Sequence, residues 1–250
     1  MTWKAPAALL ASLAVLSFAG DPAITPTEFR FVRVEYKDMQ GTRRFFGARG
    51  WWMQDWPAAE VHFTQGIRRL TRIDTGDGIH LPLTDDRIFD YPWLYATQTG
   101  YWDLRKEETD RLGDYLQRGG FLVVDDFHGP REWAAFAESM SRVLPGREIV
   151  DIEDGDSIMH CLYDIVERTY IPGLRHLRRD GAGGIRVQPQ YTPPRWRAIQ
   201  DDRGRVVVAI NYNMDVGDAW EHADMPEYPE AMTSLAYRFG INYILYSMTH

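Results

Sequence analysis

The amino-acid sequence predicts an α/β protein whose mostly parallel sheet carries helices on both of its faces. Strand-like and helix-like segments alternate through the middle of the chain, and the connections between them are short. One of the strand-like segments, Phe121–Asp126, is too apolar to have a face in water. Strands joined by helical crossovers pair in parallel, and the crossovers cover both sides of the sheet.

Length and composition suit one large domain. The chain has 250 residues, of which 44% are hydrophobic and 26% are charged, an ordinary balance for a globular protein. A chain of this length buries most of the apolar surface that it exposes when unfolded. We therefore expect a single α/β domain over residues 29–250.

The N-terminal residues predict an export signal over residues 1–19. Ala7–Phe18 is a short run of apolar and small residues, and Ser17–Ala19 has the small-x-small pattern that a signal peptidase reads. The run is shorter than the roughly 20 apolar residues of a spanning helix, although an uncleaved anchor remains the alternative. We expect an exported protein, periplasmic or secreted, without a stable membrane span after cleavage.

The first elements follow a Pro/Thr-containing linker at residues 20–28. Phe29–Glu35 alternates apolar and polar residues, which predicts a strand. Pro57–Leu70 places apolar residues at i, i+4 and i+7 behind an initial proline, which predicts a helix.

The middle of the chain is a strand–helix–strand–helix unit. Tyr91–Thr97 and Phe121–Asp126 are predicted to be buried strands. Between them lies an amphipathic helix that Asp103 can cap and that Gly119-Gly120 ends. Gly129-Pro130 begins a second helix with apolar residues on one side.

The last third of the chain begins with an irregular stretch. Ile152–Pro194 contains glycine-rich and proline-rich surface segments. Trp196–Ile199 and Val206–Ile210 predict a hairpin whose second strand is central. Apolar residues between Met232 and Ile244 predict a closing amphipathic helix.

Charge and cysteine content exclude some classes of protein. The net charge of −8 gives no electrostatic footprint for nucleic acid. The basic segment Arg175–Arg179 is interpreted as a solvated loop. Cys161 is the only cysteine, so no intramolecular disulfide can form.

Several blocks of characteristic residues occur in a fixed order along the chain. They are Arg49–Trp52 with Asp55–Pro57, Phe89–Pro92 leading to Thr99-Gly100, Leu112–Asp126, His160–Asp164, Asn211–Glu221, Glu227–Pro229 and Thr249-His250. With these blocks, the chain from about Phe29 to His250 resembles the bacterial family known as domain of unknown function 4159.

The resemblance implies a fold more than an activity, since no activity is established for the family. The family is similar in fold to the class I glutamine amidotransferase-like proteins, which have a flavodoxin-like, doubly wound sheet. Some members are joined to membrane segments and occur among envelope proteins, in agreement with an export signal. The resemblance thus implies a flavodoxin-like α/β protein of the bacterial envelope.

One departure from the amidotransferases affects the expected chemistry. Those enzymes carry a Gly-x-Cys-x-Gly nucleophile elbow after the strand that matches Phe121–Asp126. Here the turn Asp125–Gly129 contains neither cysteine nor serine, and Cys161 lacks the flanking glycines of a strained elbow. Glutaminase activity is therefore not expected.

The strongest candidate site residues follow the apolar strand directly. Ligands bind beyond the carboxyl ends of strands in an open parallel sheet, where loops and helix N-termini converge. Asp125 and Asp126, with His128, can bind a cation there or divide acid and base roles between them. The alternative is a helix-capping aspartate beside a surface one.

A second polar loop follows Val206–Ile210. It offers candidate ligand-binding side chains at Asn211, Asn213, Asp215, Asp218 and Glu221, together with Trp220 and His222. Oxygen ligands at alternate positions are typical of a cation loop, although the EF-hand spacing is missing. The alternative is that the Asx side chains only pin the loop.

Two further loops offer candidate ligand-binding residues. Thr99 and Gly100 lie in a polar and aromatic loop where a backbone could approach a ligand closely. Trp51 and Trp52 lie near Asp55, and exposed indoles stack on sugars or apolar peptide groups. Tryptophans near a helix start also commonly pack on the edge of a core, which is the alternative.

These candidates support two functional hypotheses. The first is a non-catalytic envelope module that binds a glycan, a peptide or a protein partner, with nucleic acid excluded. The second is a hydrolase that acts on a saccharide or peptide through Asp125, Asp126 and His128, assisted by Asp215 and Asp218. We expect no cofactor in either case, except that a divalent metal ion could assist both.

Overall fold

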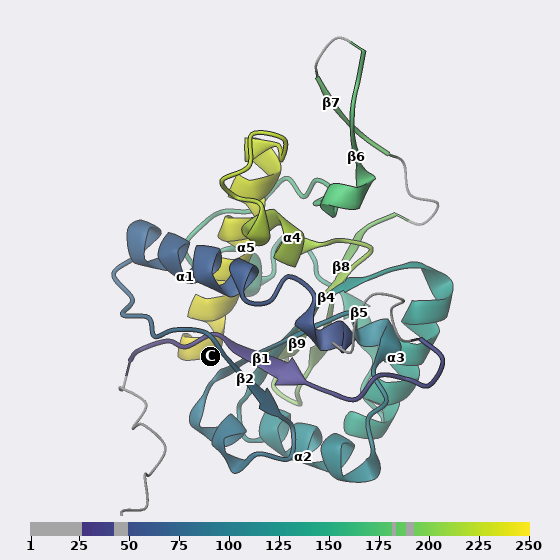
Figure 1. Ribbon diagram of the computed structural model, residues 1–250. Helices are drawn as coiled ribbons and strands as arrows, with labels where there is room; N and C mark the ends of the chain where they lie inside the picture. Colours follow the sequence, from purple (N-terminus) through teal and green to yellow (C-terminus); the bar gives the residue numbers. More distant parts are fainter. Residues whose placement is uncertain (1–26, 43–49, 182–183, 189–192) are drawn as a thin grey trace, which may run out of the picture.

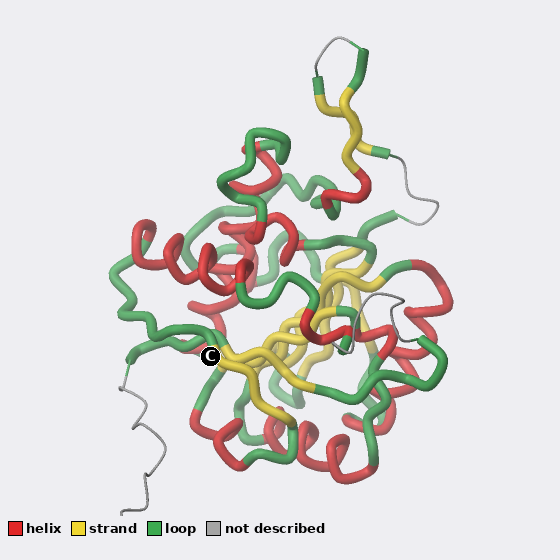
Figure 2. Tube along the Cα trace, in the orientation of Figure 1, coloured by secondary structure: helices red, strands yellow, loops and turns green. Residues whose placement is uncertain are grey.

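A computed structural model describes residues 27–42, 50–181, 184–188 and 193–250. At its centre lies a seven-stranded sheet in the order β2-β1-β3-β4-β9-β8-β5, with helices packed above and below it (Figures 1 and 2). The predicted export signal and residues 20–26 of the predicted linker lie outside the described residues.

The sheet is mostly parallel. Its strands are β1 (Val32–Glu35), β2 (Ile79–Pro82), β3 (Trp93–Thr97), β4 (Phe121–Phe127), β5 (Ile149–Asp151), β8 (Arg195–Gln200) and β9 (Val206–Tyr212). Every neighbouring pair from β2 to β9 is parallel, whereas β8 runs antiparallel to β9 and to β5. The predicted α/β class with a mostly parallel sheet is therefore confirmed.

The helices lie on both faces of the sheet. Helices α1 (Ala58–Leu70) and α5 (Glu230–Thr249) cover one face, with the short α4 (Val216–Glu221) packed against both; α2 (Lys106–Gln117) and α3 (Gly129–Val143) cover the other. Short 3₁₀ turns occur at η1 (Trp51–Met53), η2 (Asp86–Asp90), η3 (Thr99–Tyr101), η4 (Ser157–Met159) and η5 (Leu174–His176). The antiparallel hairpin of β6 (Leu177–Arg179) and β7 (Ile185–Val187) projects from the body (Figure 1).

Two apolar cores hold the layers together. Under α1 and α5, aromatic rings dominate, and Phe63 of α1 stacks on Trp220 of α4 with ring centroids 4.1 Å apart. Under α2 and α3, aliphatic side chains such as Leu122 and Val124 of β4 pack against Phe136. Burial of one such large side chain stabilises the fold by about 1.5–3 kcal/mol. The central strands β3, β4 and β9, in which every residue is buried, therefore have no face in water, as the apolar sequence of β4 predicted.

Three adjacent strands end in the same unusual backbone conformation. Gln98 after β3, Asp126 in β4 and Asn213 after β9 have φ values of 53°, 47° and 57°. Asp55, which precedes α1, has a φ of 64°. These four are the non-glycine residues with left-handed φ among the residues that the structure describes. Strained backbone of this kind clusters at functional sites.

The structure differs from the sequence expectations in its short elements. The strand predicted at Phe29–Glu35 begins at Val32, and β2 and β5 were not predicted because edge strands of three or four residues lack a periodic signal. The stretch Ile152–Pro194, expected to be irregular, contains the β6–β7 hairpin. In the described part of the chain, no helix has both the length and the apolarity needed to cross a membrane.

Candidate functional site

The candidate site lies at the carboxyl edge of the parallel strands. Six carboxyl groups gather there from four segments: Asp55 before α1, Asp125 and Asp126 in β4, Asp215 before α4, and Asp218 and Glu221 within α4. We call these six residues the acidic site. All of them except Glu221 are buried.

Asp126 lies at the centre of the acidic site because β4 is irregular there. Adjacent side chains of a regular strand point to opposite faces. The ladder between β4 and β9 shifts register between Val124 and Phe127, and the positive φ of Asp126 falls in this bulge. A bulge of this kind re-aims a side chain. The carboxylate of Asp126 accepts hydrogen bonds from Gln98 on one oxygen, and from His128 and Arg175 on the other.

Asp125 points into the protein. Its Oδ2 accepts hydrogen bonds from the Tyr95 hydroxyl at 2.9 Å and from the backbone N–H of Gly217 at 2.8 Å. Burial raises the pKa of Asp125 to about 7, although these two hydrogen bonds oppose the rise. Asp125 therefore ties β3 and α4 together.

Asp55 enters the site from the loop before α1. Arg33 of β1 holds this loop by donating hydrogen bonds to the carbonyl oxygens of Trp52, at 3.0 Å, and Gln54, at 2.6 Å. One oxygen of Asp55 accepts a hydrogen bond from the Gln54 side chain. None of the described residues gives a hydrogen bond to the other oxygen, Oδ2, although the residue is only 6% exposed. Asp55 thus has a buried, unpartnered acceptor.

Asp215 and Asp218 begin α4. Asp215 caps the helix by accepting a hydrogen bond from the backbone N–H of Asp218 at 3.0 Å. Oδ2 of Asp218 accepts a hydrogen bond from the backbone N–H of Leu174 at 2.7 Å. The segment before the hairpin is thereby fixed against α4.

The acidic site contains more carboxyl groups than basic groups that could balance their charge. Burial, followed by the charges of Asp218 and Asp126, raises the pKa of Asp55 well above its ordinary value. Burial and the same two neighbours raise the pKa of Asp215 in the same way. Asp126 differs, because the hydrogen bond and charge of His128, with Arg175, outweigh burial and lower its pKa. Without a bound cation, protons must neutralise part of the site.

Basic side chains lie on the solvent side of Asp126. Nη2 of Arg175 and Nε2 of His128 are both 2.9 Å from Oδ1 of Asp126. The rings of His128 and His176 have centroids 5.8 Å apart. Arg175 is 46% exposed, so its guanidinium connects the buried carboxylates with solvent.

The two asparagines of the second loop, Asn211 and Asn213, have structural partners. Asn211 is buried beneath the site and accepts a hydrogen bond from the Tyr243 hydroxyl at 3.1 Å. Asn213 accepts one from the backbone N–H of Gly129 and donates one to the carbonyl of Pro193. Both side chains thus pin the loop, which is the alternative that the sequence left open.

The η3 loop packs against α3. Thr99 and Gly100 are buried, and a methyl group at Gly100 would lie 2.3 Å from Cβ of Glu132. Gly100 therefore permits a close approach between the loop and the helix. Thr99 Oγ1 is buried without a hydrogen-bond partner among the described residues.

The two tryptophans do not present open faces. Trp52 is 9% exposed and lies against His80, with ring centroids 4.8 Å apart. Trp51 is half-buried and stacks on Tyr101 at 4.5 Å. Both indoles lie on the edge of the core, as in the alternative interpretation from the sequence.

Three contributors to the site were not among the predicted site residues. Asp55 was noted only as a neighbour of tryptophans, Gln98 only as part of a polar loop, and Arg175 as part of a solvated loop. A polar residue directly after a buried strand was a usable signal for Gln98. No local signal marks Arg175, because its contact with Asp126 spans 49 residues.

Fold and site together define an α/β protein with a buried acidic site at the carboxyl edge of its parallel strands. A model of the family described as Domain of unknown function (DUF4159) matches residues 30–248. The chain therefore belongs to this family, as its ordered residue blocks predicted. A search of curated proteins finds no match to the chain.

Proposed function

We propose that this protein is an exported, non-catalytic binding module of the bacterial envelope, and that a divalent cation in the acidic site forms part of its ligand-binding surface. The ligand is a glycan, a peptide or a protein partner at the mouth of the site. The export signal predicted at residues 1–19 supports the envelope location.

The observation that carries the proposal is the group Asp55, Asp126 and Asp215. Each offers a carboxylate oxygen, and the three oxygens lie within 4.8 Å of one another. The three residues are at most 6% exposed, and Oδ2 of Asp55 has no hydrogen-bond partner among the described residues. Buried carboxylates are paired with cations or are protonated.

A hard divalent cation fits this group of ligands. Carboxylate oxygens favour Mg²⁺, Ca²⁺ or Mn²⁺. Such an ion replaces the protons that burial otherwise keeps on Asp55 and Asp215, because metal ligands must be deprotonated. Arg175 and His128 already stabilise the charge of Asp126, so they compete with the cation for this carboxylate.

The strand order supports a relation in fold to the amidotransferase-like proteins. The residues present do not support the amidotransferase reaction. The order β2-β1-β3-β4-β9 corresponds to the order 2-1-3-4-5 of a flavodoxin-like sheet. The turn after β4 lacks a cysteine or serine nucleophile. Burial raises the pKa of the Cys161 thiol to about 11, which disfavours the reactive thiolate.

The second candidate is a metal-assisted hydrolase. The observation that favours it is that the pKa values of two adjacent carboxyl groups differ. The pKa of Asp125 is raised to about 7, and the pKa of Asp126 is lowered. Environments that give two neighbouring carboxyl groups different pKa values are typical of catalytic acid and base pairs. Against this role, Asp125 is fully buried, and its Oδ2 accepts hydrogen bonds from Tyr95 and Gly217. We therefore favour binding over hydrolysis.

Thermal unfolding tests the cation. The protein is stripped with EDTA, and melting curves are recorded with Mg²⁺, Ca²⁺ or Mn²⁺. An ion at a hundredfold excess over its Kd stabilises the folded state by about 2.7 kcal/mol, or roughly 5–10 °C in a chain of this size. Asp126→Asn should abolish the shift, and Asp77→Asn, at an exposed position, should preserve it. Melting curves that no ion changes would contradict the proposal.

A turnover assay separates binding from hydrolysis. The cation-loaded protein is incubated with peptidoglycan fragments and with oligosaccharides, and products are followed by mass spectrometry. The proposal expects bound but uncleaved fragments. A cleaved product that disappears in Asp125→Asn would favour the hydrolase.

A further inference from the structure

We propose that Asp218, Glu221 and His222 hold a second divalent cation, so that the acidic site binds two ions side by side. This inference rests on the proposed function, because it adds an ion to the one assigned to Asp55, Asp126 and Asp215. The second position differs from the first in its chemistry, since one of its ligands is an imidazole.

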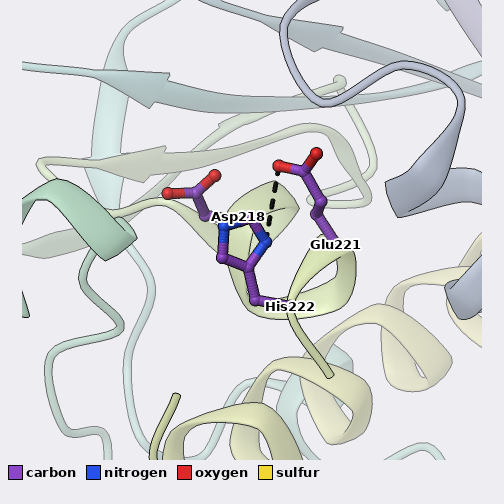
Figure 3. Close-up of side chains that lie close together, drawn as sticks. All are labelled: Asp218, Glu221 and His222. Carbon is purple, nitrogen blue, oxygen red and sulfur yellow. Dashed lines mark ion pairs between the residues drawn. The ribbon is translucent and has the colours of Figure 1, made fainter. Parts of the chain in front are cut away.

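The geometry of α4 brings the three side chains together. Residues three and four positions apart share one face of a helix, and Asp218, Glu221 and His222 have this spacing. Figure 3 shows both carboxylates and the imidazole ring converging beside the last turn of α4. One oxygen from each carboxylate and one ring nitrogen lie within 4.8 Å of one another. Three potential ligand atoms from one short segment therefore lie close together.

An imidazole nitrogen in this group lacks a hydrogen bond. Nδ1 of His222 is shielded from solvent and forms no hydrogen bond with any described residue, although it lies 3.5 Å from Oε2 of Glu221. The dashed line in Figure 3 marks this ion pair. A shielded ring nitrogen normally finds a hydrogen-bond partner or a metal ion. A cation between Glu221 and His222 would satisfy Nδ1.

Asp55 of the first position is also affected by the charges of the second. It is the 94%-buried carboxylate whose Oδ2 has no hydrogen-bond partner among the described residues, and Asp218 and Glu221 both act on its charge. Asp55 therefore adds to the negative charge that a second ion would balance.

One cation does not neutralise the acidic site. Beside Asp126, which Arg175 and His128 contact at 2.9 Å, the site contains the carboxyl groups of Asp55, Asp215, Asp218 and Glu221. The backbone N–H of Leu174 accounts for one oxygen of Asp218 and leaves the other for a cation. A second divalent ion would bring the charge of these groups close to balance.

The two positions should differ in the ions they prefer. Three carboxylates favour Mg²⁺, Ca²⁺ and Mn²⁺, whereas two carboxylates with an imidazole also suit Fe²⁺ and Zn²⁺ and are poor for Ca²⁺. Mn²⁺ is acceptable to both positions. It is therefore the probe for the number of ions.

Counting bound Mn²⁺ tests the inference. The full chain is stripped with EDTA and dialysed against Mn²⁺, and its metal content is measured by mass spectrometry. We expect two ions per chain in the wild type and one in His222→Gln. His160→Gln, which replaces an exposed histidine that contacts Asp164 and belongs to neither group of ligands, should retain two. Glu221→Gln provides a second test. Because this side chain is only half-buried, the substitution should disturb folding little, and the variant should also retain one ion.

The possible counts separate this inference from the proposed function. One ion in the wild type, unchanged by His222→Gln, would overturn the second position and leave the proposed function standing. One ion that His222→Gln removes would overturn the two-ion site and the placement of the first ion. No bound ion would overturn both. With two ions, we also expect the electron paramagnetic resonance spectrum of bound Mn²⁺ to show coupling between neighbouring ions, which His222→Gln should remove.

Discussion

Arg33 and Glu60 form an ion pair that is entirely enclosed between β1 and α1. Nε of Arg33 lies 2.5 Å from Oε1 of Glu60, and the two side chains are 0% and 1% exposed. The same guanidinium holds the carbonyl oxygens of Trp52 and Gln54. The buried guanidinium of Arg33 therefore links the sheet, the first helix and the loop that carries Asp55 into the acidic site.

Removal of Arg33 should destabilise the protein and loosen Asp55. Arg33→Met leaves the carboxylate of Glu60 buried without its partner, which should lower the free energy of unfolding by about 3–5 kcal/mol. Urea denaturation measures this loss. The double variant Arg33→Met with Glu60→Leu should recover part of it, because no unpaired charge remains. A single variant as stable as the wild type would contradict the role of the ion pair.

Arg33 also shows why the sequence predicted the layers better than the site. The alternation in Phe29–Glu35 predicted a strand, and the apolar β4 predicted a sheet covered on both faces, since these patterns are local. The same alternation makes Arg33 look like a residue on a wet face. Only the packing of α1 over β1 shows that its guanidinium is a buried anchor.

The positions of the acidic-site residues were predictable where these residues lie at the end of a strand or shortly after it. Asp125, Asp126 and Asp215 belong to this group, because carboxyl ends of parallel strands meet at one edge. The backbone details could not be predicted, since the bulge that re-aims Asp126 depends on pairing between β4 and β9. Arg175 depends on a contact across the fold with no local pattern.

Gly173 should be needed for cation binding more than for stability. A methyl group at this position would lie 2.5 Å from Oδ2 of Asp215 and 3.0 Å from Oδ2 of Asp218. Gly173→Ala should therefore displace both carboxylates and weaken Mn²⁺ binding roughly tenfold to a hundredfold, as changes around metal ligands commonly do. Isothermal titration calorimetry gives the Kd.

The control for Gly173 is Gly155→Ala. A methyl group at Gly155 meets no described atom within 4 Å, so this variant should bind Mn²⁺ like the wild type. Equal affinities in the two variants would show that Asp215 and Asp218 are not ligands in the positions seen here.

Asp201 should stabilise the β8–β9 hairpin in a pH-dependent way. Burial alone raises the pKa of Asp201, but hydrogen bonds from the backbone N–H groups of Arg205 and Arg203, with the Arg205 side chain, outweigh it and lower the pKa. A carboxyl group whose pKa is lowered by folding contributes stability above its unfolded pKa of about 3.9, and this stability is lost as pH falls through the folded pKa.

Asp201→Asn should therefore lower the free energy of unfolding at pH 7 and have little effect on it in acid. We expect a loss of about 1 kcal/mol at pH 7, because the side chain is partly exposed to solvent. The difference from the wild type should shrink below about pH 4. Urea denaturation at both pH values measures it, and a difference that grows in acid would contradict the assignment.

Arg175 should weaken cation binding because its guanidinium occupies the carboxylates that the cation needs. It lies 2.9 Å from Asp126, and the charges of Asp126, Asp215 and Asp218 raise its pKa against the effect of burial. Arg175→Gln removes this competing charge and should tighten Mn²⁺ binding by roughly threefold to tenfold, the effect of one partly screened charge. Arg186→Gln, an exposed change in the hairpin that follows Arg175, should leave the Kd unaltered. Weaker binding in Arg175→Gln would mean that the guanidinium organises the carboxylates instead of competing for them, and the acidic site would then be built around Arg175 itself.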